Sequence, residues 1–153
     1  MSPTLLKLFS EYSEYHRDPR NVAIHKLAIP LIVFHVLAML DWVEIGLEIG
    51  GYQLTLAHAV FVPVLAWYTA MSARLAALMA LFSALCLWLG QMTSSEAVIG
   101  IAIFGWIAQL VGHVRYEKRS PAFKDNIVQL LVGPIYFIAL IFGWWNPTAT
   151  AEA

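Results

Sequence analysis

The sequence is poor in charge and in cysteine. Only 12% of its 153 residues are Asp, Glu, Lys or Arg, about half of the roughly 25% that is usual in soluble domains. The single cysteine, Cys86, lies in an apolar run and excludes an internal disulfide. The net charge of −1, with no basic stripe outside the expected loops, argues against a nucleic-acid partner. Residues 1–22 contain no uninterrupted apolar core, so we expect no signal peptide.

Hydrophobic residues, in contrast, make up 60% of the chain, and the mean hydropathy is +0.70. A soluble protein of this length leaves too much of its surface exposed to bury so much apolar area. We therefore expect lipid to surround most of the chain, as one integral-membrane domain over residues 1–153. Its predicted parts are an amphipathic surface helix at 1–17, a transmembrane bundle at 18–145 and a short tail at 146–153.

Five apolar runs predict an all-α bundle of about five transmembrane helices. Crossing about 30 Å of hydrocarbon takes roughly 20 apolar residues, and the shorter runs approach this length with their flanking residues. Asp18-Pro19 and Ser120-Pro121 are helix-start signals before the first and last runs. The runs are Leu27–Leu40, Leu54–Met71, Leu75–Met92, Ala97–Gly112 and Ile127–Trp145.

Basic residues occur in every second loop, which predicts a cytoplasmic N-terminus by the positive-inside rule. We expect a bacterial inner membrane, or the endoplasmic reticulum if the protein is eukaryotic. Tryptophans near run ends fit interfacial belts, with Trp144 and Trp145 among those at predicted outer ends. The basic residues are Lys7, Arg17, Arg20, Lys26, Arg74, Arg115, Lys118, Arg119 and Lys124, and the loops between them hold Asp41, Glu44, Glu48 and Glu96, with Glu152 in the tail.

The N-terminal segment has the pattern of an amphipathic helix. Its apolar residues recur at spacings of three and four, after Ser2-Pro3. Such a helix either lies on the cytoplasmic membrane surface or packs over the bundle as a lid. Both arrangements place His16 near the inner headgroups. The residues that carry the pattern are Leu5, Leu8, Phe9, Tyr12 and Tyr15.

Three of the five histidines converge on the predicted inner face. His16 and His25 lie at the start of the first span and His113 at the end of the fourth. Asn21 precedes His25 by four residues, and Glu117 follows His113 by four, so each pair shares a helical face. Neutral imidazoles with one carboxylate suit a first-row transition metal, such as non-haem Fe(II) with open positions. Zinc accepts similar ligands, so the ligand set leaves both metals open.

Each of these residues also has an ordinary interpretation. Interfacial histidines commonly contact headgroups, and Glu117 can pair with one of the basic residues that follow it. His35 and His58 belong to the outer halves of their spans, where we expect neutral histidines that are hydrogen-bonded between helices. If they faced each other, they could hold a haem.

The arginines at the inner face also have two interpretations. Arg17, Arg20, Arg115 and Arg119 anchor the chain under the positive-inside rule. They also stand where a fatty-acid carboxylate would emerge from the bilayer. Because a guanidinium binds a carboxylate with two parallel hydrogen bonds, we regard these arginines as candidate substrate-binding residues.

The motif His16-x₄-Asn21-x₃-His25, with Pro30, and the motif Gln109-x₂-Gly112-His113-x₃-Glu117-x₃-Pro121-Ala122 form a specific pair. Together with the Gly133-Pro134 step, they resemble the small membrane-bound family of 2-hydroxy fatty acid dioxygenases. The resemblance covers most of the chain. Departures are Ala28, where glycine is common, and Leu110-Val111, where a Phe-Ile pair is usual, and none is a candidate ligand.

The resemblance implies an Fe²⁺-dependent enzyme that uses O₂ to convert a 2-hydroxy fatty acid to the acid one carbon shorter. It implies His16, His25 and His113 as iron ligands, with Glu117 as a candidate fourth. Asn21 is a candidate for contact with the substrate or for orienting a ligand, so Asn21 and Glu117 are the candidate catalytic residues. Two other hypotheses stay open at this point. One is a b-type haem protein for electron transfer, using His35 with His58 or His25 with His113, and the other is a non-catalytic lipid-binding protein.

Overall fold

The structure, a computed structural model, describes residues 1–147, so Glu152 and most of the predicted tail lie outside the described residues. That part of the chain is mostly helical, as expected. The α-helices are α1 (Pro3–Ser13), α2 (Pro19–Asp41), α3 (Leu56–Met71), α4 (Ala73–Met92), α5 (Ser95–Gly112) and α6 (Val128–Ile141). The shorter elements are the strands β1 (Glu44–Ile49) and β2 (Tyr52–Thr55), the π-helical turn η1 (His113–Glu117) and the 3₁₀ helix η2 (Ala122–Lys124).

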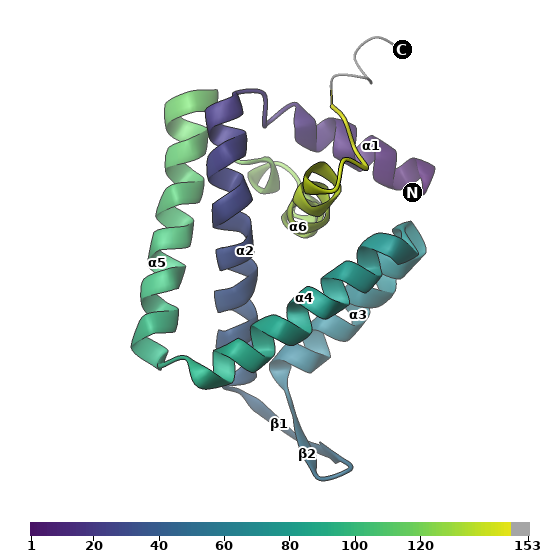
Figure 1. Cartoon of the computed structure of the whole chain (residues 1–153), viewed down its shortest axis with the longest axis vertical. Coiled ribbons are helices and arrows are strands. Elements are labelled where there is room, and N and C mark those ends of the chain that lie inside the picture. The colour runs from purple at the N-terminus through teal and green to yellow at the C-terminus, as the bar shows by residue number, and fades with distance from the viewer. Residues whose placement is uncertain (148–153) are drawn as a thin grey trace.

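The antiparallel hairpin of β1 and β2 is the exception to the all-α prediction. It replaces the acidic loop expected after the first span. Its turn is formed by Gly50 and Gly51, with φ of +60° and +82°, and a Gly-Gly pair is a hairpin signal for this reason. Both strands are largely exposed, so the hairpin projects from the helices (Figure 1).

Three described helices are long and apolar enough to cross a membrane. They are α2, α4, and α5 continued by η1 to Glu117. The outer faces of the helices also expose large apolar side chains, with Val62, Leu81 and Ile103 exposed by 64%, 70% and 57%. So many large apolar side chains exposed on the helices are unusual on a soluble monomer. These helices therefore support association with a membrane.

Helices α2 and α5 run side by side from the hairpin to the opposite end of the molecule, whereas α3 and α4 extend obliquely from the hairpin end and diverge from them (Figure 1). At the hairpin end, Asp41 at the end of α2 accepts hydrogen bonds from Thr55 Oγ1 (2.7 Å), just before α3, and from Gln91 Nε2 (3.3 Å), near the end of α4. We call the opposite end of α2 and α5 the histidine end. The far end of α3 instead lies at the start of α1, where the backbone N–H of Ser2 donates to Met71 O (2.9 Å).

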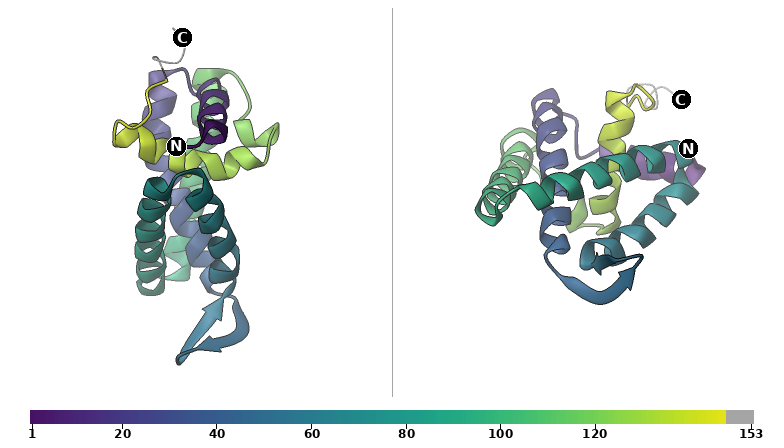
Figure 2. Two further views of the ribbon diagram at one scale, coloured as in Figure 1. Left: turned by 90° about the vertical axis from the view of Figure 1, so that its right-hand side faces the viewer. Right: turned by 60° about the horizontal axis from the view of Figure 1, so that its bottom comes forward.

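Helix α6 lies across this bundle and does not run from end to end. It is seen end-on in Figure 1 and lengthwise in the left view of Figure 2. The first turn of α6 and the segment that follows the helix both contact α1: Gln129 Nε2 donates to Glu11 (3.3 Å), and the rings of Trp145 and Phe9 pack edge to face at 5.4 Å. Trp144 packs on Arg74, 4.8 Å from the guanidinium carbon to the ring centre.

The last apolar run therefore differs from the prediction in three ways. Ser120-Pro121 leads only into the short helix η2, and α6 starts later, at Val128. No fifth span is seen in the described residues, and Trp144 and Trp145 pack on Arg74 and Phe9, which were expected at the inner face, where outer positions were expected for the tryptophans. The physical reason is that α6 has 14 residues and is mostly buried by protein. A short apolar helix of this length is more often a core or re-entrant helix than a span.

Helix α1 forms as predicted, but it packs over the bundle as a lid. Ser2 caps it by accepting from Leu5 N (3.1 Å). Leu5, Phe9 and Tyr12 are buried, and Phe9 packs edge to face on Tyr136 of α6 with ring centres 5.3 Å apart. The apolar face of this helix is therefore covered by protein. This arrangement positions the link that follows α1, which carries His16.

Candidate metal centre

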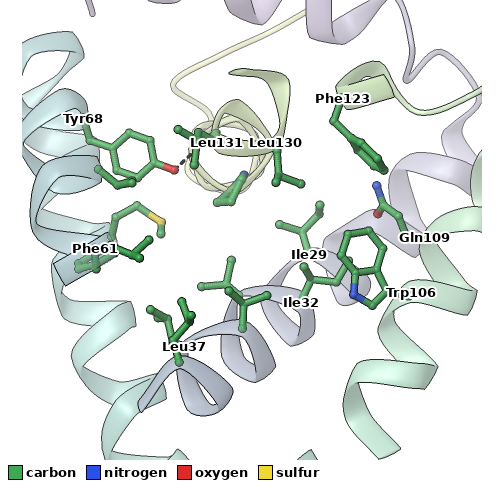
Figure 3. A pocket seen from close by; sticks show the side chains of 17 residues that line it. Ile29, Ile32, Leu37, Phe61, Tyr68, Trp106, Gln109, Phe123, Leu130 and Leu131 are labelled. Carbon is green, nitrogen blue, oxygen red and sulfur yellow. Dashed lines mark hydrogen bonds between the residues drawn. The ribbon is translucent and has the colours of Figure 1, made fainter. Parts of the chain in front are cut away.

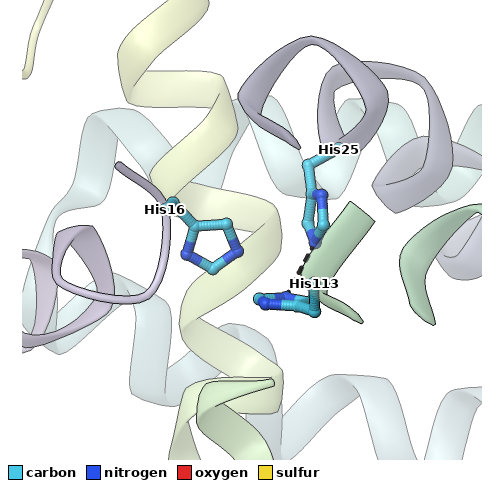
Figure 4. A group of neighbouring side chains, drawn as sticks. All are labelled: His16, His25 and His113. Carbon is cyan, nitrogen blue, oxygen red and sulfur yellow. Dashed lines mark hydrogen bonds between the residues drawn. The ribbon is translucent and has the colours of Figure 1, made fainter. Parts of the chain in front are cut away.

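Three buried histidines meet at the histidine end of the bundle. His16 comes from the link between α1 and α2, His25 from α2 and His113 from the start of η1. Each can offer one ring nitrogen, and these three nitrogens lie within 4.8 Å of one another. The side chains are at most 5% exposed. Figure 4 shows the three rings gathered around one small space. The sequence-predicted convergence of these residues is confirmed.

Backbone carbonyls orient two of the imidazoles. His16 Nδ1 lies 2.9 Å from Tyr12 O, and His25 Nδ1 lies 2.9 Å from Asn21 O. Because a carbonyl oxygen only accepts, each Nδ1 carries the proton and each Nε2 presents a lone pair. This arrangement is typical of metal-binding histidines, whose second nitrogen donates to a carbonyl or carboxylate.

The third imidazole completes a set of nitrogen donors. His25 Nε2 and His113 Nε2 are 3.1 Å apart, and His25 Nε2 has no proton, so His113 Nε2 donates. His113 Nδ1 and His16 Nε2 are buried and have no hydrogen-bond partner within the described part of the chain. An unpaired buried acceptor costs about 1–3 kcal/mol. The three histidines therefore fit a metal ion, to which each could offer the lone pair of one ring nitrogen.

The electrostatics of the site keep His16 neutral. Burial, and after it the neighbouring His25, lowers the pKa of His16 to about 2. Since only a neutral imidazole can donate its lone pair, His16 is ready to bind a metal throughout the physiological pH range. Stacking on Tyr12, with ring centres 4.1 Å apart, holds the imidazole in place.

Glu117 lies beside the three histidines and has another set of partners. Its Oε1 accepts from the backbone N–H of Asp18 (2.9 Å) and from Asn21 Nδ2 (2.9 Å). It thus ties η1 to the start of α2. Pairing of Glu117 with a basic residue of the loop was the alternative interpretation. In the described residues the ion pair is instead between Arg20 and Asp18 (2.7 Å), and Glu117 binds the amide of Asn21. The group of donors within 4.8 Å consists of the histidines alone.

Gly112 allows α5 to approach α2 closely at this site. A Cβ at Gly112 would clash with Asn21 Oδ1 and would lie 3.1 Å from His25 Cε1. About two turns earlier in α5, a Cβ at Gly105 would lie 3.3 Å from Ile32 Cγ1. Small residues of this kind let helices pack backbone to backbone. The glycine of the second motif is thus explained by packing against the first motif.

The four candidate arginines all lie on the surface at the histidine end. Arg20 binds Asp18 and lies over Tyr116, 4.5 Å from the ring centre. Arg119 lies over Tyr15 at 3.8 Å. Arg17 and Arg115 are exposed. Among the described residues, no arginine lines the cavities near the histidines.

Two glutamines line the small cavity beside the histidines instead. A cavity of about 20 Å³, the histidine cavity, is lined by His16 and His113 together with Gln109 and Gln129. Both glutamines are only 4% exposed, and in the described residues their Oε1 atoms have no partner. Sequence reasoning quoted Gln109 only within a motif and missed Gln129. The available signal was a polar amide in an otherwise apolar run.

The two remaining histidines have structural roles. His35 Nδ1 donates to Leu31 O (3.0 Å), and Trp106 Nε1 of α5 donates to His35 Nε2 (3.2 Å), which confirms the expected bond between helices. For His58 the expectation was wrong: His58 Nδ1 accepts from Thr55 N (3.2 Å), which caps its own helix. His35 therefore has no free nitrogen for a haem iron, and the 3.1 Å contact of His25 with His113 leaves no room for a macrocycle.

Comparison with known proteins agrees with this geometry. Residues 3–144 match the family model described as "2-hydroxy-palmitic acid dioxygenase Mpo1-like". The chain is 37% identical over 146 residues to the 2-hydroxy-palmitic acid dioxygenase MPO1 of Saccharomyces cerevisiae, covering 93% of this chain and 83% of the yeast protein. No solved structure matches significantly. The match spans all three histidines, and the chain belongs to the Mpo1-like family of 2-hydroxy-palmitic acid dioxygenases.

Proposed function

We propose that this protein is an Fe(II)-dependent dioxygenase that acts on 2-hydroxy fatty acids. It would use O₂ to remove the carboxyl carbon and yield the fatty acid one carbon shorter. The observation that carries the proposal is the buried group of His16, His25 and His113 in a chain of this family. Three histidines that leave coordination positions open are typical of non-haem iron sites that bind O₂ and substrate together. Measuring iron content and O₂ consumption on 2-hydroxyhexadecanoic acid tests it directly.

Some residues of the site would bind the metal, and others would hold those ligands in place. His16, His25 and His113 would be the ligands, and bound Fe(II) would supply a centre that orients O₂ and the 2-hydroxy acid and stabilises charge. Tyr12 O and Asn21 O hold two of the imidazoles through their Nδ1 protons. The backbone carbonyl of Asn21 thus orients His25, while its side-chain amide binds Glu117.

The arginines at the histidine end would attract the substrate before it enters. Arg17, Arg20, Arg115 and Arg119 are exposed at the end of the molecule that carries the histidines. An exposed guanidinium raises the local concentration of a carboxylate without being buried with it. We assign these arginines to capture at the membrane surface. Contact with the acid inside the protein falls to other residues.

Glu117→Gln is expected to retain metal. A glutamine Oε1 still accepts from Asp18 N and Asn21 Nδ2, so the tie between η1 and α2 survives. Loss of the charge should lower the free energy of unfolding by about 1 kcal/mol, because charge-assisted hydrogen bonds are stronger than neutral ones. Metal analysis and thermal unfolding in detergent measure the two effects. Glu117→Ala, which removes the acceptor, should be more destabilising. Loss of metal from the glutamine variant as complete as that from a histidine variant would make Glu117 a ligand.

The arrangement in the membrane follows from the two ends of the bundle. We infer four crossings, by α2 to α5, with the histidine end in the cytoplasm. The acidic residues Asp41, Glu44 and Glu48 lie at the hairpin end, whereas the four arginines lie at the histidine end, as the positive-inside rule requires. Helix α6 would remain on the cytoplasmic side, because its first turn and the segment that follows it both contact α1.

Reporter fusions distinguish this arrangement from five crossings. Alkaline phosphatase fused after residue 153 should be inactive, and green fluorescent protein at the same place should be fluorescent, because four crossings return the chain to the cytoplasm. Phosphatase inserted between Gly50 and Gly51 should be active, as a control on the opposite side. An active phosphatase at the C-terminus would favour five crossings and refute our arrangement.

A further inference from the structure

A second, larger cavity lies directly beside the histidine cavity. Its volume is about 170 Å³, and its lining comes mainly from α2, α3, α5 and α6, with Met79 of α4 and Phe123 of η2. We call it the apolar cavity, because nearly all of its lining side chains are hydrocarbon (Figure 3). The polar atoms of two lining residues are already occupied: Tyr68 OH donates to Leu131 O (2.6 Å), and Trp106 Nε1 donates to His35. A ligand in most of this space would therefore meet only apolar surface.

The two cavities meet at Gln109. Ile29, Gln109, Phe123 and Leu130 line both of them. In Figure 3 the amide of Gln109 stands at the edge of the apolar cavity, between Phe123 and Trp106. Gln109 Oε1 is buried without a partner in the described part of the chain. Gln109 therefore belongs to the wall that the two cavities share.

The unpaired oxygen of Gln109 indicates what the ligand offers. A buried acceptor without a partner costs about 1–3 kcal/mol, and a ligand hydroxyl would remove that cost by donating a hydrogen bond. The hydroxyl must belong to a molecule that also fills an apolar cavity. These requirements describe a long hydrocarbon tail with a hydroxyl close to a metal-binding head.

We propose that the apolar cavity binds the acyl tail of the 2-hydroxy fatty acid and that Gln109 Oε1 accepts a hydrogen bond from its 2-hydroxyl group. This inference rests on the proposed function for the identity of the head. The tail extends along α2 from Ile29 toward Leu40, which lines the far part of the cavity. Eleven residues at about 1.5 Å each span roughly 16 Å, so the site suits a long chain.

The tail can enter from the surrounding lipid. Val36 of α2 and Val60 of α3 line the cavity and are 39% and 43% exposed. An acyl chain can therefore slide between the helices without leaving the hydrocarbon phase. Val60 belongs to the part of α3 nearest the hairpin end, where the tip of a long tail would lie. We therefore assign chain-length selection to Val60 and its neighbours.

Two valines on α3 provide a matched test of this site. Val60→Trp should fill the far part of the cavity, whereas Val62→Trp is the control, because Val62 is 64% exposed and lines none of the described cavities. With 2-hydroxyhexadecanoic acid, Val60→Trp should lower the rate of O₂ consumption about tenfold relative to the control. With 2-hydroxyoctanoic acid the two variants should have equal rates. Equal rates for both variants on both acids would overturn the inference.

A binding experiment separates this inference from the proposed function. The probe is 2-hydroxyhexadecanoic acid with a diazirine at its last carbon, photolysed with the metal-free protein in detergent and without O₂. Peptide mapping should find label on α2 and α3 near Leu40 and Val60. Excess 2-hydroxyhexadecanoic acid should reduce labelling more than hexadecanoic acid does, and Gln109→Leu should remove this difference.

The outcomes are distinct. Label at the far part of the cavity without oxidation of any 2-hydroxy acid would refute the proposed function and support the acyl site. Oxidation with label only on outward-facing residues such as Ile103 would refute the acyl site and leave the function standing. An unchanged preference for the hydroxylated competitor in Gln109→Leu would overturn the role of Gln109.

Discussion

Replacing His113 with alanine is expected to abolish iron retention and O₂ consumption. The substitution removes one of three nitrogen donors and also the hydrogen-bond partner of His25 Nε2. Changes to residues that merely orient a ligand typically lower metal affinity about 10–100-fold, so loss of a ligand should cost more than about 100-fold. The measurements are elemental analysis of the purified protein and O₂ consumption with 2-hydroxyhexadecanoic acid.

His35→Ala is the matched control for this experiment. His35 is also a buried histidine on the bundle interior, but its nitrogens bind Leu31 and Trp106. It should lose stability and keep its iron. Iron undiminished in His113→Ala would refute the proposed site. If the wild-type protein holds iron and does not consume O₂ with the 2-hydroxy acid, the site stands and the reaction is wrong.

Gly112→Ala is expected to disrupt the same site from a position that contains no ligand atom. The new Cβ would displace Asn21, whose amide binds Glu117, and would press on the ring of His25. Overpacking of this kind costs about 1–3 kcal/mol of stability, and the displaced imidazole should weaken metal binding about 10–100-fold. Thermal unfolding and a metal titration of the same preparation measure the two effects.

Gly100→Ala on the same helix separates packing from helix propensity. A Cβ at Gly100 meets nothing within 4 Å, and alanine is the better helix former by about 1 kcal/mol. This variant should be as stable as the wild type or more so, with unchanged metal affinity. If Gly112→Ala behaved in the same way, the close approach of α5 to α2 would not be needed for the site.

The metal centre could be predicted from local patterns because its parts obey short-range rules. The signals Ser2-Pro3 and Asp18-Pro19 set the starts of α1 and α2, and their caps are present. Hydropathy then places the start of the first span and the end of the fourth at one end of the bundle. His16, His25 and His113 had to come close once that topology held.

Hydropathy could not predict whether α6 crosses the membrane or packs against the rest of the protein, because a helix buried by lipid and a helix buried by protein have the same composition. Only contacts between distant segments distinguish them. Gln129 bound to Glu11 and Trp145 packed on Phe9 hold the first turn of α6 and the segment that follows it against α1. The same contacts make α1 a lid, a choice that its amphipathic pattern had left open.

The sequence by itself determined that the chain is mostly helical, with apolar helices long enough to cross a membrane, and which three histidines meet. Both follow from rules of composition and helical spacing that act within a segment. Tertiary structure alone decided that Glu117 ties η1 to α2, and that Gln109 and Gln129 face the histidine cavity. The direction of a side chain relative to another helix depends on how the helices pack, and that depends on small-residue contacts such as Gly112 against Asn21 and His25.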